Sequence, residues 1–130
     1  MAEELKRFPD PKQLSPLALA FIGDGVYSLL VRERLLQISG KPIGELHKES
    51  VKLVNAKAQS NAIELISEKL TEEEMGIYKR GRNANSAHHP KNTDVIDYRR
   101  ATGVEALFGY LYLSNRLDRM YELFDIIFSK

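Results

Sequence analysis

Asp24 is the first residue whose surroundings suggest chemistry. It lies in the segment FIGDGVY, between Gly23 and Gly25, inside a stretch with helical spacing of apolar residues. Each glycine costs a helix interior roughly 1 kcal/mol relative to alanine, and burying an unpaired carboxylate costs still more. A segment that keeps three such residues in succession is more typical of a functional site than of a packing site.

Glu105 has similar surroundings, since small and apolar residues flank it from Gly103 to Gly109. Two such carboxylates can meet if their helices pack together, and close approach would be permitted by Gly23, Gly25, Gly103 and Gly109. Adjacent carboxylates repel unless a cation lies between them, and hard oxygen ligands with water suit Mg²⁺. The alternative is that each acid pairs with a buried Arg or Lys; we favour a shared metal ion.

A cationic segment is the second candidate site. No acid occurs between positions 79 and 91, although the net charge of the whole chain is only +1. Residues 81–92, GRNANSAHHPKN, have no periodic apolar residue and predict a long loop. Arg and Lys neutralise phosphates, and Asn can reach sugar hydroxyls or base edges. The candidate RNA-binding residues are Lys79, Arg80, Arg82, Asn83, Lys91, Asn92 and Arg99.

The alternative for this segment is a run of charged residues that is exposed to solvent and binds nothing. The histidines carry less information than the cations. His88 and His89 are adjacent, so their side chains are expected to point apart, and we expect a structural or merely exposed role for them and for His47.

Helices must position these residues. Ser15 and Pro16 predict a helix start, with an end near Gly40. Residues 44–70 predict one long helix or two joined near Asn55, with one apolar stripe formed by Leu46, Val51, Val54, Ala58, Ala62 and Leu65.

Three further helix boundaries can be read from the sequence. Thr71 and Glu74 form a capping box that opens a short helix, which Gly81 can close. Thr93 with Asp94 starts the helix that carries Glu105, and a last amphipathic helix follows from about Leu117. No alternating strand pattern occurs, so the predicted fold class is all-α.

The bulk composition bounds the type of protein. A length of 130 residues fits one domain over residues 1–130, and the absence of cysteine excludes disulfides and thiolate metal sites. The polar beginning MAEELKRFPD is not a signal peptide, and no apolar run approaches the ~20 residues of a membrane span. A cytoplasmic location without a membrane partner is therefore predicted.

Several segments carry a resemblance to a known family. LALAFIGDGVYSLLVRERLL resembles the signature helix of ribonuclease III, and TGVEALFGYLYL resembles its second acidic motif. LHKESVKLVNAKAQ, KRGRNANS and PKNTDVIDYRRATGVEALFGYLYL are similar to Mini-ribonuclease III, the short bacterial branch without a double-stranded RNA-binding domain. The resemblance extends from about Leu14 to Lys130.

The resemblance implies a helical bundle like the ribonuclease III endonuclease domain. Asp24 matches the catalytic aspartate and Glu105 the metal-binding glutamate. Further acids of the full-length family are replaced here, at Leu17, Ala20 and Thr102. We therefore expect one ion held by Asp24 and Glu105, with room for a second ion that substrate recruits.

The activity implied by the resemblance is Mg²⁺-dependent hydrolysis of double-stranded RNA that leaves 5′-phosphate ends, with Mn²⁺ as a substitute. It also implies a homodimer, a 23S ribosomal RNA precursor as substrate, and assistance from a ribosomal protein bound to that precursor. Without a separate RNA-binding domain, weak and strongly salt-dependent binding is expected. The alternatives are a catalytically weakened RNA-binding module with the same fold and a helical interaction protein whose acids are salt-bridged.

Overall fold

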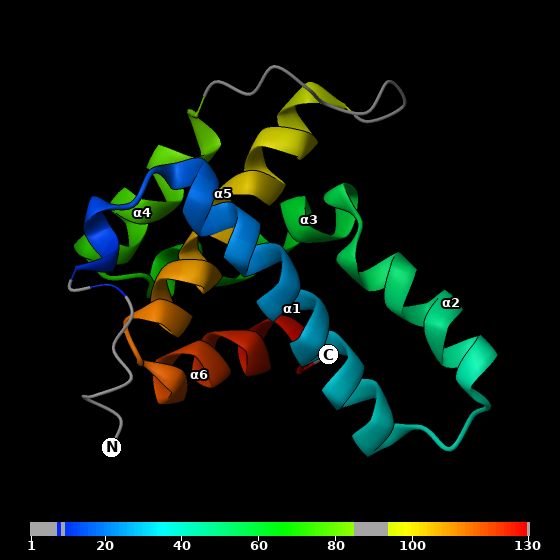
Figure 1. Cartoon of the computed structure of the whole chain (residues 1–130). Helices are drawn as coiled ribbons and strands as arrows, with labels where there is room; N and C mark the ends of the chain where they lie inside the picture. Colours follow the sequence, from blue (N-terminus) through cyan, green and yellow to red (C-terminus); the bar gives the residue numbers. More distant parts are fainter. Residues whose placement is uncertain (1–7, 9, 85–93, 130) are drawn as a thin grey trace.

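The computed structural model describes residue 8 and residues 10–84 and 94–129 (Figure 1). In these residues the chain is helical and has no strand, as the sequence predicts. The elements are η2 (Pro11–Gln13), α1 (Pro16–Ile38), α2 (Ile43–Val54), α3 (Ala56–Ile66), η3 (Ser67–Lys69), α4 (Glu72–Arg82), α5 (Val95–Leu113) and α6 (Leu117–Phe128). Among the helices of these residues, none has the length and apolar character needed to cross a membrane.

The helix boundaries follow local capping signals. The Ser15 hydroxyl accepts the Ala18 N–H at 3.1 Å, with Pro16 at the first helical position of α1. The Asn55 side chain accepts the Ala58 N–H at 2.9 Å and so starts α3, which makes residues 44–70 two joined helices rather than one.

The boundaries of α4 and α5 follow the same rule. The predicted capping box is present at the start of α4, where the Thr71 and Glu74 side chains each accept the other residue's backbone N–H. Asp94 is the N-cap of α5 and accepts the backbone N–H groups of Ile96 and Asp97. These short-range hydrogen bonds explain why the boundaries were predictable.

Helix α5 is the central element. Every residue from Ala101 to Leu111 is buried except Glu105, which is half-buried. A helix that is apolar on all sides must be enclosed by other elements. Helix α5 accordingly packs against α1, α3, α4 and α6, and Figure 1 shows α1 crossing it near the middle of the molecule. Glu105 is thus an ionisable group in the core helix.

Helix α4 ends later than the sequence predicted. It runs through Arg82, so Arg82, which was expected in the loop, lies with Lys79 and Arg80 on the last turn of the helix. Gly81 does not cap the helix. It is buried against α5, where a Cβ atom would lie 2.7 Å from the Ala106 Cβ, so its role is to let two helices approach. The rest of the predicted loop, residues 85–92, lies outside the described residues.

The buried faces of α2 and α3 also differ from the apolar stripe predicted for residues 44–70. Val51 and Leu65 are exposed, and the buried residues of α3 are Gln59, Ser60, Ala62, Ile63 and Ile66. The stripe prediction treated residues 44–70 as one continuous pattern. Helix α3 begins anew after Asn55, and its buried face includes a polar residue, Gln59.

Candidate metal-ion and RNA site

The crossing of α1 and α5 brings the two candidate carboxylates together. A Cβ atom at Gly23 would collide with the backbone carbonyl oxygen of Glu105, and one at Gly109 would collide with the carbonyl oxygen of Leu19. Only hydrogen side chains permit this approach. Because Asp24 follows Gly23 directly, the same contact places Asp24 beside Glu105.

Gly25 and Gly103, which were expected to act together with Gly23 and Gly109, have other surroundings. Gly103 serves the packing of α5 on α4, since a Cβ atom there would lie 2.8 Å from the backbone oxygen of Tyr78. A Cβ atom at Gly25 would meet nothing within 4 Å among the described residues. The prediction that all four glycines join the two carboxylate helices was therefore wrong for Gly25 and Gly103.

Asp24 and Glu105 differ in exposure and interact directly. Asp24 is exposed, so the expected cost of carboxylate burial applies to Glu105. Burial, followed by the hydrogen bond with Asp24 and the Asp24 charge, raises the pKa of Glu105 to about 8. At neutral pH the pair therefore holds a proton when no cation is present.

In the described part of the chain, neither carboxylate pairs with a cation. Among the described residues, no salt bridge joins Asp24 or Glu105 to an Arg or Lys. The buried acid that does pair with a guanidinium is Glu74, which accepts two hydrogen bonds from Arg119 at 2.9 and 2.8 Å. The interior-salt-bridge alternative thus describes Glu74 and does not describe the candidate pair.

Gln59 belongs to the site and was not selected from the sequence. Its side chain is buried in α3 and lies beside Glu105, where it lowers the Glu105 pKa against the effect of burial. The available signal was a polar residue in helical register with Ala62, Ile63 and Ile66. Burial raises the pKa of Tyr27, and the negative charge of Glu105 adds to this effect.

The donor set is small. In the described part of the chain no group of three or more Asp, Glu, His or Cys side chains could hold a metal ion. Ala20 and Thr102 occupy the positions where further acids were considered, and the Thr102 hydroxyl donates to the Tyr98 carbonyl at 2.9 Å. Two adjacent carboxylates fit a hard divalent cation whose remaining ligands come from water or a substrate.

Two of the candidate RNA-binding arginines already have partners. Arg80 donates to the backbone carbonyls of Lys12 and Leu14 at 3.2 and 3.1 Å, and so ties the segment before α1 to α4. Arg82 donates to the Asn83 side chain at 3.1 Å. Its guanidinium also lies 5.7 Å from the Tyr78 ring centroid.

The other candidates are distributed over two helix ends. Lys79 and Asn83 are exposed at the end of α4, and Arg99 is exposed in the second turn of α5. Lys91 and Asn92 lie outside the described residues. Because α4 packs against α5, the exposed cations at the end of α4 and near the start of α5 lie on neighbouring helices.

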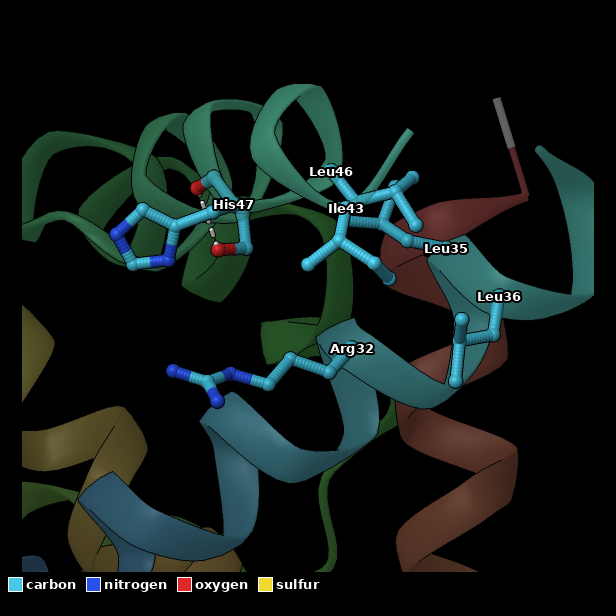
Figure 2. A pocket seen from close by; sticks show the side chains of 7 residues that line it. Arg32, Leu35, Leu36, Ile43, Leu46 and His47 are labelled. Atoms are coloured by element: carbon cyan, nitrogen blue, oxygen red, sulfur yellow. Dashed lines mark hydrogen bonds between the residues drawn. The ribbon is translucent and has the colours of Figure 1, made fainter. Parts of the chain in front are cut away.

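An apolar surface adjoins Asp24 on α1. Leu17, Phe21, Leu29 and Leu36 are all exposed on this helix, and Phe21 is 81% exposed. A pocket lies between the end of α1 and the start of α2, and the exposed Leu36 is one of its lining residues (Figure 2). Figure 2 shows the polar ends of Arg32 and His47 on one side of this pocket and four aliphatic side chains, of Leu35, Leu36, Ile43 and Leu46, on the other.

Comparison with known proteins gives the family. The model of the ribonuclease III domain matches residues 17–116, a range that includes both carboxylates. The chain belongs to the ribonuclease III family. The family, the all-α fold of its catalytic domain and the endoribonuclease class are therefore confirmed predictions.

Individual relatives place the chain in the Mini-ribonuclease III branch. It is 49% identical to Mini-ribonuclease 3 of Thermoanaerobacter sp. over 113 residues, 87% of this chain and 80% of the relative. It is 46% identical to Mini-ribonuclease 3 of Brevibacillus brevis over 127 residues, 98% of this chain and 93% of the relative. An X-ray structure of a Fusobacterium nucleatum protein has a TM-score of 0.80 and 34% identity, covering 90% of this chain and 93% of the other.

Proposed function

We propose that this ribonuclease III family member is a Mg²⁺-dependent endoribonuclease of double-stranded RNA. Its one catalytic domain would span residues 1–130, with Asp24 and Glu105 as the catalytic, metal-binding residues. The observation that carries the proposal is the direct interaction of these carboxylates without a cationic partner among the described residues. Two interacting acids in this state favour a proton or a metal ion between them.

Asp24 and Glu105 would hold the divalent ion, as generally expected of ribonuclease III enzymes, with Mn²⁺ as a substitute for Mg²⁺. When bound, the ion supplies Lewis-acid activation of the scissile phosphate and of the attacking water. Asp24 faces solvent, where RNA can approach, and Glu105 is anchored in the core helix. The products would carry 5′-phosphate ends.

The exposed cations near α4 and α5 would bind the RNA backbone. Lys79, Asn83 and Arg99 are exposed and suit contacts with phosphate or ribose, and Lys91 and Asn92 belong to the same proposal. Arg82 can contribute through its remaining donors. Arg80 stays a candidate, although a change at Arg80 would also loosen the contact with the segment before α1. Such binding weakens steeply as salt rises.

The active form would be a homodimer. Leu17, Phe21 and Asp24 are spaced by four and three residues, so they share one side of α1. Covering this apolar surface with a second copy would bury Phe21 and place the two Asp24 sites near one another. A duplex has two strands, and a twofold dimer provides one site for each.

The substrate that we propose is the 23S ribosomal RNA precursor, cut at both ends in the cytoplasm. This expectation comes from the Mini-ribonuclease III branch. A ribosomal protein bound to the precursor would add affinity for this RNA.

Cleavage of a long RNA duplex tests the proposal. The wild-type chain should cut with Mg²⁺ and should not cut with EDTA. Asp24→Asn and Glu105→Gln should each lower the rate by about 100-fold or more, because each removes half of the charge that would hold the ion. Glu68→Gln, at an exposed acid of η3, is the matched control and should cut like the wild type.

Other outcomes would identify another function. A gel shift of the RNA without cutting would support the RNA-binding module, and neither binding nor cutting would support a helical interaction protein. Unchanged cutting by Asp24→Asn, with native circular dichroism, would remove Asp24 from the mechanism.

A further inference from the structure

We propose that Gln59 is a positioning residue that orients Glu105 for the metal ion. This inference rests on the proposed function, since it concerns the same carboxylate pair. Gln59 is 2% exposed, on the face of α3 that packs against α5, and its side chain lies close enough to the Glu105 carboxyl group to lower its pKa. Asp24 approaches the same carboxyl group from α1.

The chemistry of an amide suits this position. A buried carboxylate without a donor would be costly, and its orientation would be set only by packing. An arginine or lysine would supply donors, as Arg119 does for Glu74, but its positive charge would neutralise Glu105 and repel a metal cation. A neutral amide donates a hydrogen bond and leaves the full negative charge available to the ion.

The surroundings of Gln59 restrict its motion. Ala62, Ile63 and Ile66 anchor the same face of α3 in the interior, and the Asn55 cap sets where α3 begins. The amide is therefore enclosed in the interior, since only 2% of Gln59 is exposed. Groups that orient a metal ligand in this way contribute about 10- to 100-fold to metal affinity or activity when they are removed singly.

The test is a comparison of metal affinity and RNA affinity in matched variants. Gln59→Met keeps the side-chain length and removes the donor. It should raise the Mn²⁺ dissociation constant, measured on the full chain without RNA by isothermal titration calorimetry, by about 10- to 100-fold. The Mg²⁺ concentration for half-maximal cutting should rise similarly, while the KM for RNA at saturating Mg²⁺ stays within about twofold.

Two further variants separate positioning from general stability. Ile63→Val removes one methyl group from a buried residue of the same helix and should lower the Tm without changing the metal requirement. Gln59→Lys would place an ammonium against Glu105, and should prevent Mn²⁺ binding and cutting although circular dichroism remains helical.

The outcomes distinguish this inference from the proposed function. If the wild type cuts with Mg²⁺ and folded Gln59→Met has the same Mn²⁺ affinity and Mg²⁺ requirement, the positioning role is overturned and the nuclease stands. If the wild type neither cuts nor binds Mn²⁺, the proposed function itself fails.

Should both Gln59 variants unfold, the wild-type chain provides the decisive measurement. The Gln59 side-chain amide signals in a ¹H–¹⁵N spectrum should broaden at low Mn²⁺ if the ion binds at Glu105. Unaffected signals at saturating Mn²⁺ would overturn the inference.

Discussion

At the scale of single residues, a proton and a metal ion compete for the same place between Asp24 and Glu105. The ordinary pKa of a glutamate is about 4.5, and burial followed by the interaction with Asp24 raises that of Glu105 to about 8. The folded chain therefore keeps a proton that the unfolded chain has already released across this range. Folding stability from this group is present below the ordinary pKa and is lost as pH rises through the folded pKa.

We predict that the protein in EDTA becomes less stable from about pH 5 to pH 8. The expected fall in Tm is several degrees, since 1 kcal/mol corresponds to roughly 2–8 °C for small domains. Glu105→Gln carries no titrating carboxyl and should show a smaller fall, and saturating Mg²⁺ should reduce it in the wild type. Thermal unfolding followed by circular dichroism measures this, and equal pH slopes for the wild type and Glu105→Gln would contradict it.

At the scale of elements, glycine contacts determine where the helices cross. Gly23 and Gly109 allow α1 to touch the backbone of α5, and Gly81 and Gly103 do the same for α4 and α5. Helix α5 therefore receives a close neighbour on two sides. The first of these contacts also sets the separation of the Asp24 and Glu105 carboxylates.

Gly23→Ala and Gly25→Ala form a matched pair that tests this role. A methyl group on Gly23 would collide with the Glu105 carbonyl oxygen, whereas one on Gly25 has open space among the described residues. Gly23→Ala should cost about 1–3 kcal/mol or more through overpacking, and it should lower cutting because the carboxylates separate. Gly25→Ala should stabilise the chain by up to about 1 kcal/mol.

Chemical denaturation and the duplex-cutting assay measure both effects. A Gly23→Ala protein with wild-type stability and activity would show that the close crossing of α1 and α5 is not needed.

At the scale of the whole molecule, polar anchors hold the outer helices and leave one apolar surface uncovered. Glu74 is 2% exposed and pairs with Arg119, which joins the start of α4 to α6. Tyr121 donates to Glu33 at 2.9 Å and joins α6 to α1. The exposed side of α1 with Phe21, and the pocket shared with α2, have no such cover within the described residues.

Phe21→Asp is predicted to convert the proposed homodimer into monomers. A large aromatic side chain buried at an interface can contribute about 2 kcal/mol or more to the binding free energy. The loss of that energy raises the dimer Kd by at least roughly 30-fold. Folding should be preserved, because Phe21 is 81% exposed in the single chain. Analytical ultracentrifugation at micromolar concentration measures the change.

The control is Leu65→Ser, which changes an exposed apolar side chain on a different helix, α3. This variant should remain dimeric. An unchanged sedimentation coefficient for Phe21→Asp would exclude this face of α1 as the interface.

The sequence alone determined the features that depend on near neighbours in the chain. The Ser15, Thr71 and Asp94 caps lie within three residues of the N–H groups that they accept, so residue order was enough to predict them. The carboxylates stood out for the same reason, because Asp24 and Glu105 are each surrounded in sequence by small and apolar residues. The family resemblance rests on these same segments.

Only the tertiary structure decided which faces meet. Periodicity places Gln59 on one face with Ala62 and Ile63, but it could not show that this face meets Glu105 or that Gly81 serves packing. It also could not show that Arg80 binds the carbonyls before α1, or that Asp24 stays exposed while Glu105 is half-buried. Each of these depends on the rotation and crossing of helices distant in sequence, which contacts across the whole core determine together.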